Sequence, residues 1–258
     1  MTLLDLPPDL PQSVDPKLQL HKVTTREELD AIIPLEWATY HNPYRPEYQF
    51  LHPVFGPTPA DRGAALAADR ALVWGRHVAN PASHWIYVTD STTGDLLGAT
   101  EWLFYDRNPF PQGPQRVTAT WWPEGEGREF ASELVTRLYR PRMAWCQRAF
   151  AALNATAVHP AHRRRGVGTL LMAWGVKRID ELGLDSLIEA TDAGRALYER
   201  HGYRWMLTVT TDMAKQDASD EWRAYHSQLG NPSQHILWRP KGGDWDVDGP
   251  KAPWEVKA

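Results

Sequence analysis

Three arginines and two glycines in one short run could bind an anion. The run Arg163-Arg164-Arg165-Gly166-Val167-Gly168 follows a predicted strand and precedes a predicted amphipathic helix. The first amides of a helix have no intrahelical partners, and the helix dipole adds roughly half a positive charge at that end. Glycines there let a phosphate approach the backbone, while arginines supply charge around it. The sequence therefore predicts a site for a diphosphate.

The common nucleotide-binding motifs and a nucleic-acid site fit this run less well. Leu171 occupies the place of the third glycine in a dinucleotide fingerprint, and the chain contains no GxxxxGK[ST] phosphate loop. The net charge of −4 and the pI near 6.2 provide no general attraction for nucleic acid or an anionic membrane. A nucleic-acid site built on the arginines stays the weakest alternative, and we expect neither a nucleic-acid nor a membrane partner.

A second pattern, near the end of the chain, suggests calcium only superficially. Asp244, Asp246, Asp248, Gly249 and Glu255 stand at the spacing of an EF-hand loop. Such a loop works between two helices, whereas this run follows Pro-Lys-Gly-Gly and contains a further proline. We interpret it as part of an acidic tail and predict no metal site.

Composition limits the compartment in which these groups work. No apolar stretch approaches the length of a membrane span, and the first residues carry acids and prolines in place of a secretory leader. Cys146 is the single cysteine, which excludes an internal disulfide and any CxxC metal site. We therefore expect a cytoplasmic protein, whereas the sequence leaves the oligomeric state open.

The elements that must position the anion site alternate between strands and helices. Turn residues and hydrophobic periodicity predict strands over 153–158, 187–191 and 203–209, with helices over 168–182 and 194–201. Upstream we predict a strand over 18–23, a capped helix over 26–40, an irregular loop over 41–59, a helix over 61–79 and a hairpin of strands 84–90 and 96–105.

The chain reads as one domain between two loose ends. We predict an arm over 1–17, a domain over 18–240 and a loose acidic tail over 241–258. Prolines and glycines after the hairpin indicate an insertion over about 106–141, with a helix at 128–139 and another turn or two of helix within 142–150. Near the end of the domain, residues 221–229 are predicted to be helical, and residues 235–238 form the last strand.

Two motifs together resemble one protein family. The run 163–168 resembles the R/Q-x-x-G-x-G/A signature of GNAT acetyltransferases, and Leu197-Tyr198-Glu199-Arg200-His201-Gly202-Tyr203 is similar to their L-Y-x-x-x-G-F landmark. The resemblance is good over 154–203 and fair for the hairpin and the first helix, and the long loops resemble those of larger fungal-type members. It implies an α/β (α+β) GNAT fold, with a central twisted mixed sheet flanked by helices and the insertion between the hairpin and the strand 153–158.

The resemblance also implies acetyl-CoA as co-substrate. Its pantetheine arm would lie between the strands 153–158 and 187–191, and the amides of residues 164–169 would take its pyrophosphate. Amides around residue 158 would hold the arm and polarise the thioester carbonyl. The residues assigned to the cofactor in this way are Ala157, Val158, His159, Arg163, Arg164, Arg165, Gly166, Val167, Gly168, Thr169 and Thr191.

Attack of an amine on a thioester needs a proton acceptor and a proton donor. By the resemblance Tyr198 is the donor, although it could simply pack its helix against the sheet. Relatives carry Glu or His on the strand where this chain has Ala152 and Asn154, so the base must lie elsewhere, or water alone must serve. Glu101, Glu36 and Glu189 are each candidates for the base, and each is also plausible as an ordinary salt-bridged acid. Our candidate catalytic residues are Tyr198, Glu101 and Asn154, and those on the acceptor side are Glu36, Tyr40 and Glu189.

The sequence thus predicts transfer of an acetyl or short acyl group to the primary amine of a small molecule by direct attack. An O-acyltransferase of the same fold and a non-catalytic acyl-CoA sensor stay open as alternatives. The acceptor itself is not identified, because we expect its pocket to be built by residues 41–59, the insertion and the segment after 209, where no motif occurs.

Overall fold

A computed structural model describes residues 15–41, 44–245 and 251–255, and within them one seven-stranded mixed sheet. Its strand order is β1-β2-β3-β4-β5-β7-β6, in which only β4 and β5 pair in parallel. The strands are β1 (Leu18–Lys22), β2 (Ser83–Asp90), β3 (Leu96–Tyr105), β4 (Phe150–Val158), β5 (Ser186–Ala190), β6 (Arg204–Thr210) and β7 (Ser233–Arg239). The expected central mixed sheet is confirmed.

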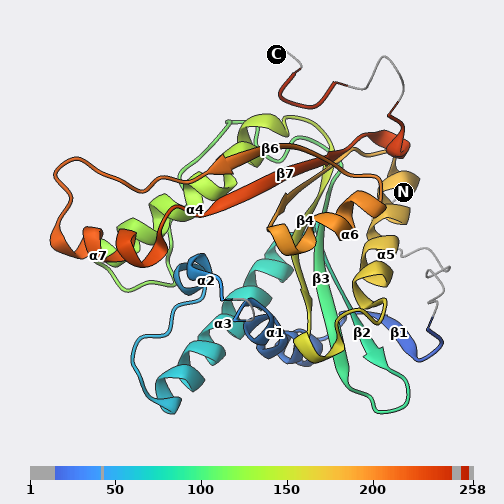
Figure 1. The fold of residues 1–258 in the computed structure, drawn as a ribbon, viewed down its shortest axis with the longest axis horizontal. Coiled ribbons are helices and arrows are strands. Elements are labelled where there is room, and N and C mark those ends of the chain that lie inside the picture. The colour runs from blue at the N-terminus through green and yellow to red at the C-terminus, as the bar shows by residue number, and fades with distance from the viewer. Residues whose placement is uncertain (1–14, 42–43, 246–250, 256–258) are drawn as a thin grey trace.

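Helices cover both faces of the sheet (Figure 1). On one face α5 packs against β2, β3 and β4, and on the other α1 and α3 pack against the same part of the sheet. A third group, α2, α4 and α7, packs together beside the sheet. The helices are α1 (Arg26–Tyr40), α2 (Pro46–Leu51), α3 (Pro59–Ala79), α4 (Glu126–Trp145), α5 (Val167–Leu182), α6 (Arg195–Arg200) and α7 (Asp220–Leu229).

Local signals in the sequence explain where these helices begin and end. Thr25 and Glu28 form the predicted capping box of α1, and Thr58 and Asp61 form a second one at α3. Gly183 ends α5 in the left-handed conformation that its missing Cβ makes inexpensive. Because such caps are local signals, most predicted elements begin and end within a few residues of their observed bounds.

Two predictions about the helices were wrong. The predicted loop 41–59 contains the short helix α2, whose first residue, Pro46, suits a helix start because it needs no N–H there. The predicted helix 128–139 and the turns after it form the single helix α4, which continues through Pro141. Burial of its apolar face offsets the hydrogen bond that proline removes.

The last strand lies inside the sheet, although its place near the end of the domain did not predict this. β7 pairs with β5 on one side and with β6 on the other, so β6 is the edge strand. Because β7 covers the other side of β5, any opening beside β5 must lie between it and β4.

The feature that shapes the site is a bulge in β4. Glu101 pairs with Ala155 and Trp102 with Leu153, which leaves Asn154 as an extra residue opposite β3. The pairing of β4 with β5 ends at Leu153 with Ile188. Because a bulge bends its strand, β4 turns away from β5 from Asn154 onward.

The division into arm, domain, insertion and tail stays a prediction. Residues 1–14 of the predicted arm, and Asp246 and Asp248 of the calcium-loop pattern with Gly249, lie outside the described residues. In the part of the chain that the structure describes, none of the helices is both long and apolar enough to cross a membrane.

Candidate active site

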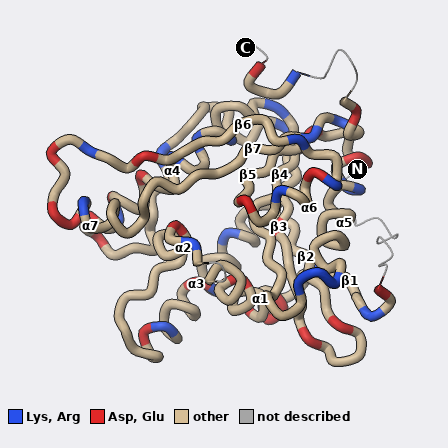
Figure 2. Tube along the Cα trace, in the orientation of Figure 1, with Lys and Arg blue, Asp and Glu red and all other residues tan. Residues whose placement is uncertain are grey.

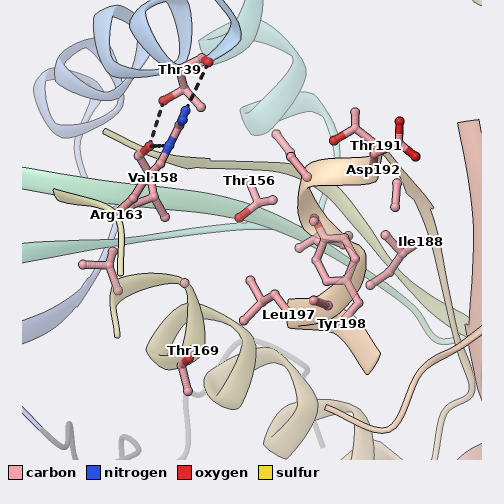
Figure 3. A pocket seen from close by; sticks show the side chains of 18 of the residues that line it. Thr39, Thr156, Val158, Arg163, Thr169, Ile188, Thr191, Asp192, Leu197 and Tyr198 are labelled. Atoms are coloured by element: carbon pink, nitrogen blue, oxygen red, sulfur yellow. Dashed lines mark hydrogen bonds between the residues drawn. The ribbon is translucent and has the colours of Figure 1, made fainter. Parts of the chain in front are cut away.

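A cavity of about 780 Å³ occupies the gap between the diverging strands β4 and β5 (Figure 3). Gly166 and Gly168 line one end of it, and Asn154 and Glu189 line the other. Thr39 and Tyr40 of α1 close one side, and Leu197 and Tyr198 of α6 lie across from them. The cavity therefore joins the predicted anion site to the predicted reaction centre.

The start of α5 has the donors that an anion site needs. Gly166 caps the helix with φ of 91°, and no side chain caps it. The first intrahelical bond runs from the Leu170 amide to the Gly166 carbonyl, at 3.0 Å, so the amides of Val167, Gly168 and Thr169 have no intrahelical partner. This end of the helix can bind a diphosphate through its backbone.

The three arginines of the turn have different partners (Figure 2 shows the turn as a continuous basic segment). Arg165 binds Asp90 at 2.7 Å, and this hydrogen bond lowers the pKa of Asp90 to about 2. Arg163 donates to the Val158 carbonyl at 3.4 Å and to the Thr39 carbonyl at 3.5 Å.

Arg164 lines the cavity and makes no side-chain hydrogen bond or ion pair with the described residues. Its φ of 67° is one of two positive values among the described non-glycine residues. The structure thus brings all three arginines to the turn. Arg165 fastens the turn to the β2–β3 hairpin, whereas Arg164 can reach a ligand.

The edge of β4 that faces away from β3 presents alternate backbone groups to the cavity. The Val158 carbonyl there accepts from Thr39 and Arg163, and the Thr156 backbone is hydrogen-bonded to Tyr40. The His159 amide donates to the Leu97 carbonyl at 2.9 Å, so it belongs to the ladder with β3. By the alternation of an antiparallel ladder, the amide of Ala157 also faces β3, while those of Thr156 and Val158 face the gap. Of the three residues predicted to hold the pantetheine arm, Val158 alone therefore directs its backbone there, and the sequence did not single out Thr156.

Tyr198 lies in the wall of the cavity, beside Leu197 and Ile188 (Figure 3). Its ring covers Gly194 so closely that a Cβ on that glycine would come within 2.5 Å of the ring. Burial raises the pKa of the Tyr198 hydroxyl, so it keeps its proton at neutral pH. It can therefore act as a proton donor, and its packing role is equally evident.

Asn154 is held at both ends of its side-chain amide. Its Nδ2 donates to Glu101 at 2.6 Å, and its Oδ1 accepts from Arg142 at 3.1 Å. Glu101 is buried, does not line the cavity, and also accepts from Ser83 at 2.5 Å. Burial raises the pKa of Glu101, although both hydrogen bonds oppose that shift.

Arg142 is a site residue that no sequence pattern indicated. It comes from the last turn of α4 and donates to both carboxylate oxygens of Glu189, with Nε to Oε1 at 3.0 Å. The side chains are 6% and 9% exposed. Asn154 and Glu189 each follow the last paired residue of their strand, so Arg142 bridges the two strands where they separate. An arginine after a proline in a helix carries no motif that could have identified it.

Glu36 and Tyr40 occupy one face of α1, one turn apart. Tyr40 lines the cavity, whereas Glu36 is buried behind it. Burial raises the pKa of Glu36 to about 8, and the nearby carboxyl groups of Asp69 and Glu101 add to the shift. Glu36 forms no hydrogen bond with the described residues.

Thr191, the remaining predicted cofactor residue, lines the cavity just after β5. Next to it, Asp192 binds His235 of β7 at 2.5 Å. No three His, Cys, Asp or Glu side chains within the described ranges are grouped so that they could hold a metal ion.

Comparison with known proteins agrees with this geometry. Residues 127–205 match the model of the acetyltransferase (GNAT) domain. No curated protein sequence matches the chain. The matched residues contain the turn before α5, the gap between β4 and β5, and α6, whereas the α1 and β3 residues of the site lie outside the match.

Two solved structures share the fold. One, the polyamine N-acetyltransferase of Drosophila melanogaster, has a TM-score of 0.55 and 17% identity, and the alignment covers 86% of this chain and 97% of that one. An agmatine N-acetyltransferase has a TM-score of 0.55 and 16% identity over 86% and 98% of the two chains. At such identities the likeness establishes the fold and leaves the substrate to the chemistry of the site.

Proposed function

We propose that the chain is a GNAT-type acetyltransferase that uses acetyl-CoA, since residues 127–205 match the acetyltransferase (GNAT) domain, and that it acetylates the primary amine of a small molecule. The observation that carries the proposal is one continuous cavity from the free amides of α5 to Asn154 and Glu189. We further propose that it acts in the cytoplasm, since its single cysteine, Cys146, is buried and unpaired.

The residues at the cavity fit acetyl-CoA. The amides of Val167, Gly168 and Thr169 suit its diphosphate, and Arg164 supplies a guanidinium beside them. The pantetheine arm then fits the gap, where it can pair with the backbone of Thr156 and Val158 as an added strand would. When bound, acetyl-CoA supplies the activated acetyl group. The gap directs that group toward Asn154.

The reaction joins the amine nitrogen to the carbonyl carbon and breaks the carbon–sulfur bond. The ammonium nitrogen must lose its protons before and during attack, and the departing sulfur must gain one. We assign the proton for sulfur to Tyr198, because its raised pKa keeps the hydroxyl protonated. The Val158 amide, which faces the gap, is placed to stabilise developing charge on the carbonyl oxygen.

For the proton acceptor we prefer Glu36 to Glu101. Both oxygens of Glu101 already accept hydrogen bonds, from Ser83 and Asn154, so its role is to orient the Asn154 amide at the cavity wall. Glu36 has no such donors, and its pKa of about 8 lies near the pH at which a base must gain and lose a proton. A water molecule beside Tyr40 would carry the proton from the amine to Glu36.

A non-catalytic sensor would bind acyl-CoA at the same site but would not transfer the acetyl group. The test is a screen of primary amines with acetyl-CoA, read as release of free thiol. We expect thiol release with at least one amine class, in proportion to the acetylated product found by mass spectrometry. Stabilisation by CoA without turnover on any amine would favour the sensor. Turnover restricted to alcohols would favour the O-acyltransferase.

A further inference from the structure

A second cavity, of about 640 Å³, lies between α1, α2 and α7. It is lined by the segments in which the sequence analysis placed the acceptor pocket, namely residues 41–59, the insertion after the hairpin and the region after 209. Six aromatic rings form much of its wall: Trp37, Tyr48, Phe50, Phe55, Trp122 and Tyr225.

The rings are fixed against one another before any ligand arrives. Trp122 stacks on Phe50 with centroids 5.9 Å apart, and Phe55 meets the same indole edge-on at 5.1 Å. The indole N–H of Trp122 donates to the Phe50 carbonyl at 2.9 Å. Phe55 is nevertheless 50% exposed, at the cavity. An apolar, flat ligand would cover this surface with little loss of side-chain freedom.

The lining of this cavity contains a positive charge and no negative one among the described residues. No aspartate or glutamate lines the cavity in the part of the chain that the structure describes, and Arg62 is its single arginine or lysine. The Arg62 guanidinium lies 4.9 Å from the centre of the Trp37 ring and has no carboxylate partner among the described residues. The nearby carboxylate of Asp69 is engaged by Trp37 at 2.7 Å and by His52 at 2.8 Å.

Such a lining favours an anionic group and disfavours a polycation. Arg62 is exposed, so the anion would bind at the mouth. A ligand with several ammonium groups would meet a guanidinium and find no acid to balance its charge. The acceptor chemistry therefore differs from that of the two fold neighbours, which are named for polyamine and agmatine.

One wall separates this cavity from the first. Tyr48 lines the second cavity and Tyr40 the first, and their rings stack with centroids 4.6 Å apart. The Tyr48 hydroxyl is buried and has no hydrogen-bond partner among the described residues. A buried hydroxyl without a partner is destabilising, so this wall gains a hydrogen bond when its rings move and a polar group of a ligand reaches the hydroxyl.

We infer that the second cavity selects the acceptor, and that the acceptor is a primary amine on an aromatic body with a carboxylate at its far end. The carboxylate binds Arg62 at the mouth, and the ring lies among Phe50, Phe55 and Trp122. The amine, on a short arm, lies against the Tyr48 ring, and its acetylation requires the stacked rings of Tyr40 and Tyr48 to move apart so that it reaches the first cavity. The inference rests on the proposed function, since it names the substrate of that reaction.

Three probes separate the contributions: 4-(aminomethyl)benzoate, 4-methylbenzylamine and putrescine. Binding to the full chain in the presence of CoA is measured by calorimetry. We expect the benzoate to bind at least tenfold more tightly than the methyl analogue, and putrescine to bind more weakly than both. Equal affinity of the benzoate and its methyl analogue, or tighter binding of putrescine, overturns the inference.

Two variants locate the binding. Arg62→Met should remove the tenfold preference for the benzoate and leave 4-methylbenzylamine unchanged. Arg76→Met is the matched control, because Arg76 lies on the same helix, 4.6 Å over the Trp121 ring, and does not line the cavity. Phe55→Ala, at a half-exposed position, should weaken both aromatic probes by the same factor. A preference that survives Arg62→Met overturns the assignment.

The inference and the proposed function can fail separately. CoA binding and thiol release with other amines, without a preference for the benzoate, would retain the acetyltransferase and reject this acceptor. Tight binding of the benzoate that Arg62→Met removes, without thiol release from any amine, would retain the cavity as an aromatic-anion site and reject the proposed transfer.

Discussion

Arg142 and Glu189 form a buried ion pair at the point where β4 and β5 separate. The guanidinium reaches both carboxylate oxygens, and its second branch donates to Asn154, the bulged residue of β4. A residue from outside the sheet thus holds the two strands in the separation that the cavity needs. The width of the gap depends on this pair because the pairing of β4 with β5 ends at Leu153 and Ile188.

Replacing Arg142 by Met should destabilise the protein and loosen the site. The change leaves Glu189 buried without a partner, which costs about 3–5 kcal/mol. The measurement is chemical unfolding together with CoA affinity. Arg140→Met is the control, because Arg140 is exposed on the same helix and makes no ion pair with the described residues. An effect no larger than that of Arg140→Met would contradict the bridging role.

Replacing Gly168 by Leu should abolish CoA binding. A Cβ at Gly168 would lie 3.0 Å from Leu197, so a longer side chain must project into the cavity or displace α6. For the unchanged protein, CoA at one hundred times its dissociation constant should raise the free energy of unfolding by about 2.7 kcal/mol. The variant should lose this gain. Gly63→Leu, on α3 with open space around it, should keep the gain.

Tyr198→Phe should slow turnover and leave the cofactor bound. Loss of a general acid lowers kcat by about 10²-fold or more, whereas the phenyl ring still packs over Gly194. Steady-state kinetics and CoA calorimetry check the two parts. Tyr203→Phe is the control, since that hydroxyl donates to Ser186 at 2.7 Å inside the core. If kcat is unchanged, Tyr198 only packs α6 against the sheet.

Glu36 should make stability fall as the pH rises. Its pKa of about 8 lies above the 4.5 of an unfolded chain, so the folded state binds the extra proton between these values. Stability from the protonated form is complete below about pH 4.5 and is lost through pH 8, with an upper limit of roughly 5 kcal/mol.

Unfolding of Glu36→Gln at pH 5 and pH 8 measures this effect. The variant should lack the decline, whereas Glu27→Gln, at an exposed position of the same helix, should retain it. If Glu36 also accepts the proton from the amine, kcat of the unchanged protein should rise through about pH 8, and the variant should lose that rise. A decline in stability that persists in Glu36→Gln would show that another group is responsible.

The cofactor end of the site could be predicted from the sequence because its parts are local. Gly166 and Gly168 must stand at the start of a helix that follows a strand, and short-range signals define both elements. The backbone amides that we propose for the diphosphate belong to consecutive residues. A motif of a few positions therefore contained the fold class, the co-substrate and the position of Tyr198.

The acceptor end depended on the tertiary structure because its parts come from distant segments. Arg142, Asn154 and Glu189 meet only when α4 crosses the end of the gap, and nothing in their spacing indicates that contact. The bulge at Asn154 arises from the register in which β4 pairs with β3. The alternation of apolar and polar residues along a strand does not reveal that register.

The same reason applies to the second cavity and to the choice of base. Arg62 and Trp122 line one space because α3 and the insertion pack beside α2, and Glu36 acquires its raised pKa from burial and from carboxylates on other elements. The sequence alone predicted the fold class and the proposed co-substrate, since local order encodes the motifs that indicate both. The packing of segments far apart in the chain decided which groups surround the acceptor, since burial and charge depend on neighbours in space.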